Sequence, residues 1–204
     1  MPKPLLSARY RVVVRDAQGR IIRIEEAPSK SFILNFLYLW WLCFNLNTSD
    51  TISAVNSSGQ QFTTVLSQPA GWYIEYESSG SPYAGPYLGI QVGSGTSAPS
   101  ASSPYLESLI LNGTSPGQLV YGSFSYISPS ISSYPITIQA TNTFINNSGG
   151  SVTVGEIGFA PQMVDMGSSD QYFAVLIAHD VLSPAVSVPN EGRITVTYTL
   201  QVNA

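Results

Sequence analysis

The segment that most clearly indicates the fold is Arg193-Ile194-Thr195-Val196-Thr197-Tyr198-Thr199-Leu200-Gln201-Val202. Its apolar residues alternate with polar ones, and a period of two with one apolar face is typical of a half-buried antiparallel strand. Residues 136–140 repeat this pattern. Further strands are predicted near residues 51–55, 61–66, 72–77, 87–92, 118–127, 135–145, 151–157 and 171–178. Because turn residues separate these short strands, the predicted fold class is mostly β, an antiparallel β-sandwich with a jelly-roll-like body.

The composition excludes several classes of protein. Only 10% of the 204 residues are charged and 44% are hydrophobic, whereas disordered chains combine high charge with low hydrophobicity. Eight cations are too few for a polybasic nucleic-acid binder. The single cysteine, Cys43, cannot form a disulfide scaffold. Together with the single histidine, His179, it is also too little for a structural zinc site.

Positive charge gathers in the first 30 residues, which hold seven cations and three acids and therefore carry +4. The remaining residues hold one cation and nine acids. Two β-rich runs, 9–14 and 21–25, flank a turn that contains Gly19, which predicts a β-hairpin. A basic hairpin suggests an acidic partner, which could be another copy of the chain, another protein or nucleic acid; the alternative is a solvated face without a partner. The arginines expected to make this contact are Arg9, Arg11, Arg15, Arg20 and Arg23.

The most apolar stretch lies within residues 31–47 and predicts a helix. A helix of its 13 to 15 apolar residues would span about 20 Å, too short for a bilayer core of roughly 30 Å, so no transmembrane span is expected. No small-residue cleavage site follows, so a signal peptide is not expected either. A helix that is apolar all round is buried, either on its own sheet or between subunits, unless it contacts a membrane. The expected contact residues are Phe32, Phe36, Leu37, Trp40, Trp41 and Phe44.

Candidate catalytic and ligand-binding groups give no coherent site. His179 precedes Asp180, but no G-x-S-x-G motif supplies a nucleophile. Glu75 and Glu77 share one face of a predicted strand, where carboxyls more simply form its solvated side. Residues 93–96 resemble a phosphate loop only in their glycines. We therefore expect no catalytic residues, no cofactor and no metal site, and no enzyme activity.

Other residues have architectural interpretations. Gly93 and Gly95 are expected to adopt positive φ at a sharp turn. Residues 146–150 have the composition of a hairpin turn between two strands. Glu156 lies in an apolar run, where a buried carboxylate would need backbone N–H donors. Four N-x-S/T sequons give candidate glycosylation sites at Asn47, Asn56, Asn112 and Asn146.

Four short motifs follow one another along residues 31–203. The first is Ser31-Phe32-Ile33-Leu34-Asn35-Phe36-Leu37, and the second is the G-x-G-T-x-A-P loop from Gly93 to Pro99. The third is Asn146-Asn147-Ser148-Gly149 followed by Glu156-Ile157-Gly158, and the fourth is Val188-Pro189-Asn190-Glu191-Gly192 running into Val196-Thr197-Tyr198. In this order the chain resembles a diffuse group of structural proteins of tailed phages and archaeal viruses. The resemblance implies a building block of the virion.

Three kinds of function are compatible with these observations. The first is a viral structural protein in a capsid, turret, spike, tail or fibre, whose partners are copies of itself and other virion proteins. Its apolar helix and strand edges would be covered by neighbours, with residues 1–30 as an arm, 31–47 as the helix and 48–204 as the body. The second is an extracellular filament or surface-layer subunit joined by strand addition. The third is a module that binds a host-surface glycan, with stacking residues among Trp72, Tyr73, Tyr83, Tyr87 and Tyr105.

Overall fold

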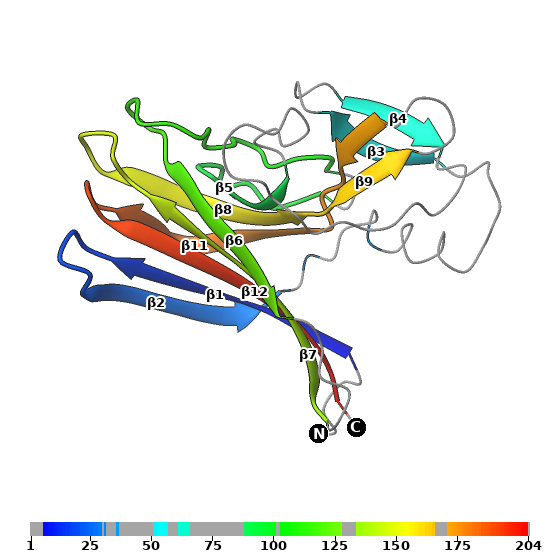
Figure 1. Cartoon of the computed structure of the whole chain (residues 1–204), viewed down its shortest axis with the longest axis horizontal. Coiled ribbons are helices and arrows are strands. Elements are labelled where there is room, and N and C mark those ends of the chain that lie inside the picture. Colours follow the sequence, from blue (N-terminus) through cyan, green and yellow to red (C-terminus); the bar gives the residue numbers. More distant parts are fainter. Residues whose placement is uncertain are drawn as a thin grey trace. The chain divides into compact units, whose positions relative to one another are not determined.

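The computed structural model describes residues 6–29, 31, 36, 51–56, 61–65, 88–100, 103–127, 134–165 and 171–203. These residues form twelve strands (Figure 1). The strands are β1 (Leu6–Arg15), β2 (Ile21–Pro28), β3 (Thr51–Asn56), β4 (Gln61–Val65), β5 (Gly89–Gly93), β6 (Val120–Ile127), β7 (Ile136–Ile145), β8 (Val152–Ala160), β9 (Gln162–Asp165), β10 (Gln171–Ala174), β11 (Ala178–Val188) and β12 (Arg193–Val202).

The described strands form three sheets. Their orders are β2-β1-β12-β7-β6, β4-β3-β10-β9 and β11-β8-β5. The pairings within the five-stranded and four-stranded sheets are antiparallel, as is that of β5 with β8. The predicted fold class is therefore confirmed: the chain is mostly β and sandwich-like, with antiparallel sheets and an N-terminal hairpin.

The chain forms two compact units. The first comprises residues 1–30, 111–153 and 187–204, and the second comprises 31–110 and 154–186. This division differs from the predicted arm, helix and body, because β1 pairs with β12 along all ten of its residues. The hairpin is thus part of the five-stranded sheet. Of the predicted apolar helix, only Ser31 and Phe36 are among the described residues; Phe32, Leu37, Trp40, Trp41 and Phe44 lie outside them.

The alternation in β12 produces the two faces of the five-stranded sheet. Ile194 and Val196 are fully buried, and their cross-strand partners in β1, Val14 and Val12, are buried on the same face. Phe144 of β7 extends this apolar row. Burying a valine, isoleucine or phenylalanine side chain contributes about 1.5–3 kcal/mol. The row therefore holds the chain's N- and C-terminal strands together.

Threonines occupy polar positions of the alternating pattern in β12. Thr197 faces Thr141 across the β12–β7 pair, and Thr195 faces Thr143. In both pairs the hydroxyl oxygens lie 2.9 Å apart and are hydrogen-bonded. A β-branched residue fits a pleated surface well, and its hydroxyl here finds a partner within the sheet.

The second unit has its own apolar core. Leu88, Leu106, Ala160, Ala174 and Leu176 are buried in one cluster, against which Leu109 packs. These residues come from the ends of strands and from the loops between them. The core therefore joins the start of β5, the end of β8 and the end of β10 within this unit.

The turns at residues 146–151 and 189–192 join strands of different sheets, which corrects the expectation of a hairpin at 146–150. β7 belongs to the five-stranded sheet, whereas β8 belongs to the three-stranded sheet. β11 and β12 are divided between these sheets in the same way. A hairpin composition fixes the turn but cannot show whether the two strands it joins will pair.

Four other strand predictions need correction. Residues 178–188, for which the sequence predicted no strand beyond residue 178, form the continuous strand β11. The predicted strand 171–178 ends at Ala174. Strand β9 was not predicted, and β8 continues to Ala160. The predicted strand 72–77 lies outside the described residues.

Candidate functional site

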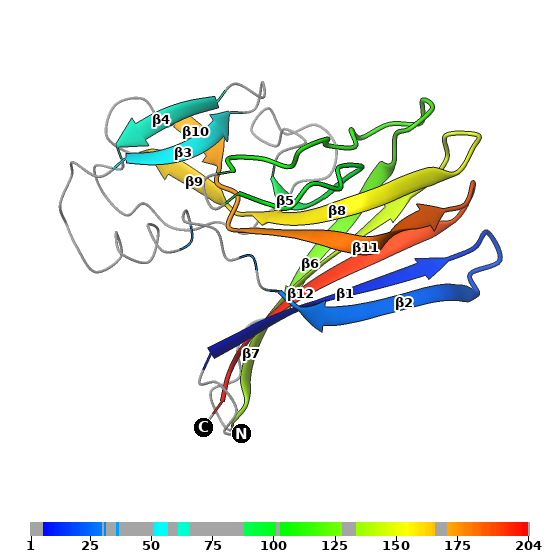
Figure 2. The same cartoon turned by 180° about the vertical axis from the view of Figure 1, so that it is seen from behind.

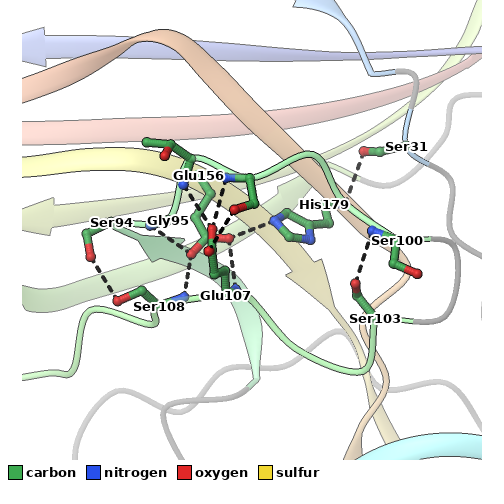
Figure 3. Close-up of polar contacts among 11 residues, drawn as sticks. Ser31, Ser94, Gly95, Ser100, Ser103, Glu107, Ser108, Glu156 and His179 are labelled. Atoms are coloured by element: carbon green, nitrogen blue, oxygen red, sulfur yellow. Dashed lines mark hydrogen bonds and ion pairs between the residues drawn. The ribbon is translucent and has the colours of Figure 1, made fainter.

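The most unusual polar group in the described part of the chain is the carboxylate of Glu156. Glu156 lies in β8, and its side chain is 0% exposed. The segments from Ser94 to Gly95 and from Glu107 to Ser108 lie around it, and His179 approaches from β11 (Figure 3). All these residues belong to the second unit. Because burying a charge without partners is very costly, the stability of the segments around Glu156 depends on the hydrogen bonds that its carboxylate accepts.

Four donors surround the carboxylate of Glu156. Its Oε1 accepts hydrogen bonds from the backbone N–H groups of Gly95, at 3.1 Å, and Ser108, at 2.7 Å. Its Oε2 accepts from the backbone N–H of Glu107, at 3.0 Å, and from Nε2 of His179, at 2.7 Å. An ionised carboxylate offers about four lone-pair sites, so its acceptor capacity is filled. The sequence expectation that a buried Glu156 needs backbone donors is thus met.

His179 is held in one orientation by this contact. Its side chain is 4% exposed, and its backbone N–H donates to Oγ of Ser31 at 3.2 Å. Since an ionised carboxylate can only accept, Nε2 of His179 carries the proton that it shares with Glu156. The other ring nitrogen, Nδ1, is buried and has no hydrogen-bond partner among the described residues.

A second carboxylate holds the next residues of the same loop. Oε2 of Glu107 accepts from the backbone N–H groups of Thr96, at 3.0 Å, and Ser97, at 2.9 Å, and Oε1 accepts from Oγ of Ser97 at 2.8 Å. Three consecutive amides, those of Gly95, Thr96 and Ser97, therefore donate to two carboxylates of the chain itself. Residues 93–96 therefore resemble a phosphate-binding loop only superficially. The N–H groups that could bind a phosphate already donate to the carboxylates of Glu156 and Glu107.

Gly93 and Gly95 are required by close packing rather than by backbone angle. Neither has the positive φ expected from the sequence, whereas Gly89 at the start of β5 does. A Cβ on Gly95 would lie 2.6 Å from Oε1 of Glu156 and 2.6 Å from Oε2 of Glu107. A Cβ on Gly93 would collide with Oε1 of Glu156 as well. The prediction of positive φ at Gly93 and Gly95 is therefore wrong. The two glycines are needed because a larger residue would leave no room for the carboxylate of Glu156.

The hydrogen bonds keep both carboxylates ionised. Burial by itself raises the pKa of Glu156. The hydrogen bond from His179 and the amide hydrogen bonds from Ser108 and Glu107 outweigh that effect, so this pKa lies below its ordinary value. Hydrogen bonds from the backbone and hydroxyl of Ser97, with a further one from Thr96, likewise lower the pKa of Glu107 against burial and the neighbouring charge of Glu156.

The arrangement suits structural locking better than catalysis. A general base needs a free lone pair within reach of a substrate proton, and Glu156 has all its lone pairs engaged and no exposed surface. Within the described ranges, no group of three or more His, Cys, Asp or Glu side chains could hold a metal ion. The carboxylates of Glu156 and Glu107 instead fix the loop that follows β5 to strand β8.

The five arginines proposed for an acidic partner all lie in the hairpin, and four form ion pairs within it. Arg9 pairs with Glu26 at 2.9 Å, and Arg11 approaches the same carboxylate at 4.0 Å. Arg20 pairs with Asp16, and Arg23 with Glu25, both at 2.7 Å. Arg15 donates to the carbonyl of Gly19. The described hairpin, residues 6–29, therefore carries a net +2 from five arginines and three acids, and its docking on a partner stays a prediction.

Burial of Asn146 contradicts its proposed glycosylation. The residue is 0% exposed, and its amide nitrogen donates to the carbonyls of Gly150 and Val188 at 2.8 Å each. Its backbone N–H donates to the carbonyl of Gly192, and its carbonyl accepts from Glu191. A glycan on this nitrogen would replace one of its two hydrogens, so one of the two side-chain bonds would be lost. Asn146 is instead the clasp that joins the turn at 146–151 to the turn at 189–192.

The described residues include only some of the other sequons and aromatic residues. Asn112 is exposed, Asn56 lies in β3, and Asn47 is outside the described residues. Of the proposed stacking residues, the structure describes only Tyr105, which is 38% exposed. The glycan-binding interpretation therefore stays a prediction.

Sequence reasoning missed two features. Glu107 gave no signal, because its partners lie ten and eleven residues away in a loop. The exposed isoleucines of β2 were visible in the run Ile21-Ile22-Arg23-Ile24, where three of four residues are apolar. They are 48%, 53% and 51% exposed, respectively.

Comparison of the chain with protein-family models, curated proteins and solved structures finds no match. Among the described residues, the structure contains no helix with the length and hydropathy that crossing a membrane requires.

Proposed function

We propose that the chain is a non-enzymatic structural subunit of a virion, with a jelly-roll-like body that assembles with copies of itself and other virion proteins. The observation that supports assembly is the exposed apolar surface of strand β2 at the edge of its sheet. It ends the order β2-β1-β12-β7-β6 and exposes Ile21, Ile22 and Ile24 by about half each. An exposed apolar edge strand is a template for pairing with another chain, and soluble monomers usually protect such edges.

The buried carboxylate site supports the same function indirectly. In the second unit the ionisable groups Glu156, Glu107 and His179 fix a loop and leave no open acceptor at Glu156. Such rigid loops suit a subunit that must present the same surface in every copy. The motif order described from the sequence supports placement in a virion rather than in a cellular assembly.

Electron microscopy and sedimentation velocity of the purified full-length chain test the proposal. We expect closed or capped symmetric particles, or rings, whose amount increases with protein concentration. Open filaments of indefinite length would favour the filament or surface-layer subunit instead, since the same edge could join copies by strand addition. A protein that stays monomeric at about 100 μM, well above the micromolar range of ordinary weak association, would contradict assembly altogether.

A further inference from the structure

Strand β2 is the outermost strand of the five-stranded sheet, as Figures 1 and 2 show. On one side it pairs with β1, and no described strand pairs with its other side. Ile24, at its centre, is 51% exposed. Arg23 and Glu25 flank it and form an ion pair with each other at 2.7 Å.

The register shows which backbone groups of β2 face outward. Arg9 lies opposite Pro28, and the N–H of Ser29 donates to the carbonyl of Ala8 at 3.0 Å. Bonded and non-bonded pairs alternate along an antiparallel ladder, so Ala27, Glu25 and Arg23 bond to β1. Ile24, Glu26 and Pro28 therefore direct their backbone groups outward. Pro28 has no N–H to offer there, which is the position that proline takes in an edge strand.

We propose that β2 pairs antiparallel with β2 of a second copy of this chain, about a two-fold axis beside Ile24. In this register Ile24 faces Ile24 of the second copy, and the outward groups of both residues form a bonded pair. Arg23 of each copy then faces Glu25 of the other. The two five-stranded sheets become one continuous sheet, and the contact is isologous, so each copy contributes the same patch.

The charges distinguish this register from its neighbours. Only shifts of two residues keep outward groups opposite outward groups. A shift in one direction places Arg23 opposite Arg23, and a shift in the other places Glu25 opposite Glu25. Like charges directly opposite each other destabilise a pair of strands, whereas opposite charges stabilise it. The Ile24-centred register has two opposite-charge pairs and an apolar pair at the axis.

The β-bulge between β1 and β2 sets the length of the pairing. Val14 lies opposite Arg23 and Arg15 opposite Ile21, so Ile22 is the extra residue. The regular part of the new ladder therefore runs from Arg23 to Glu25, with Ile22 opposite Glu26 of the second copy at its ends. This inference rests on the proposed assembly function and names the partner of its edge strand.

Cysteine cross-linking tests the register in the full-length chain with Cys43→Ser as background. Opposite residues of a bonded pair have Cα atoms about 5.5 Å apart, within the usual disulfide range. Ile24→Cys should therefore give a covalent dimer under mild oxidation. Ile22→Cys is the matched control, because Ile22 is equally apolar and 53% exposed. In the proposed register the two copies of residue 22 are offset by four residues, about 13 Å, and should not cross-link.

A charge exchange tests the same register without cysteines. Arg23→Glu places like charges opposite each other twice and should weaken dimerisation at least about tenfold in sedimentation equilibrium. Adding Glu25→Arg restores both the internal pair and the pairs across the axis, so the double variant should dimerise like the wild type. A double variant that stays as weak as Arg23→Glu would overturn the register.

The remaining outcomes separate the pairing from the proposed function. Equal cross-linking of Ile22→Cys and Ile24→Cys would show random collision of edges and refute the pairing. Absence of both cross-links in a protein that still forms particles would refute the β2 contact and leave assembly standing. A protein that forms neither particles nor dimers contradicts both proposals.

Discussion

Replacing Glu156 by glutamine tests whether the buried carboxylate locks the loop that follows β5. The substitution keeps the size of the side chain and one acceptor oxygen but turns the other oxygen into a donor amide. If the remaining oxygen stays near Gly95 and Ser108, the new NH₂ group faces the N–H of Glu107 and Nε2–H of His179. Two donors would then lose their acceptor.

A change of tautomer cannot rescue the variant. His179 could move its proton to Nδ1 so that Nε2 accepts from the new amide. Nδ1 is buried without a partner among the described residues, so its N–H would become the unsatisfied donor. Leaving a buried donor unsatisfied costs about 1–3 kcal/mol. With two such donors in either tautomer, the Glu156→Gln variant should lose about 2–6 kcal/mol of free energy of unfolding.

Urea unfolding followed by circular dichroism measures this loss, which should lower the midpoint by at least about 1 M. Hydrogen exchange should increase at the amides of Gly95, Glu107 and Ser108. Glu107→Gln is the matched control: its oxygen can still accept from Thr96 and Ser97 while its NH₂ donates to Oγ of Ser97, so the midpoint should move much less. If the two variants unfold at the same urea concentration, the carboxylate of Glu156 is not the lock.

Three further predictions concern packing, the clasp and pH. Gly95→Ala should lower the melting temperature by several degrees because its Cβ has no room, whereas Gly150→Ala, with nothing within 4 Å of the new atom, should not. Asn146→Ala should lose about 1–3 kcal/mol in urea unfolding because the buried carbonyl of Val188 loses its donor; the adjacent exposed Asn147→Ala should stay within about 0.5 kcal/mol of the wild type. Stability should fall as the pH falls below the ordinary carboxyl value of 4.5. The unfolded chain takes up a proton at Glu156 before the folded chain does, so the stability that this carboxylate contributes above that pH is lost as the pH passes through its lowered folded pKa.

Each of these has an outcome that contradicts it. Equal melting temperatures for Gly95→Ala and Gly150→Ala would mean that the loop shifts freely away from the carboxylates. Equal losses for Asn146→Ala and Asn147→Ala would remove the clasp from the structural account. In the pH series, Glu156→Gln should flatten the acid limb of the stability curve; an unchanged limb would assign the acid sensitivity to other carboxyls.

The sequence alone determined the class of the fold and the positions of most described strands. Alternation in residues 193–202 depends on neighbouring side chains pointing to opposite faces, a local property that requires no knowledge of the partner strand. The same holds for the hairpin around Gly19 and for the turn composition at 146–150. The need of Glu156 for backbone donors also followed from its apolar neighbours, because a charge in such a run must be compensated wherever the chain goes.

Only the tertiary structure showed which segments meet. Strands β7 and β8 are joined by a hairpin-like turn yet pair in different sheets, since pairing depends on faces contributed by β12 and β5 from distant parts of the sequence. Gly95 is essential because residues 107 and 156 come to lie beside it, not because of its own dihedral angles. Burial of Asn146 and exposure of Ile24 likewise depend on strand order, which a local pattern does not contain.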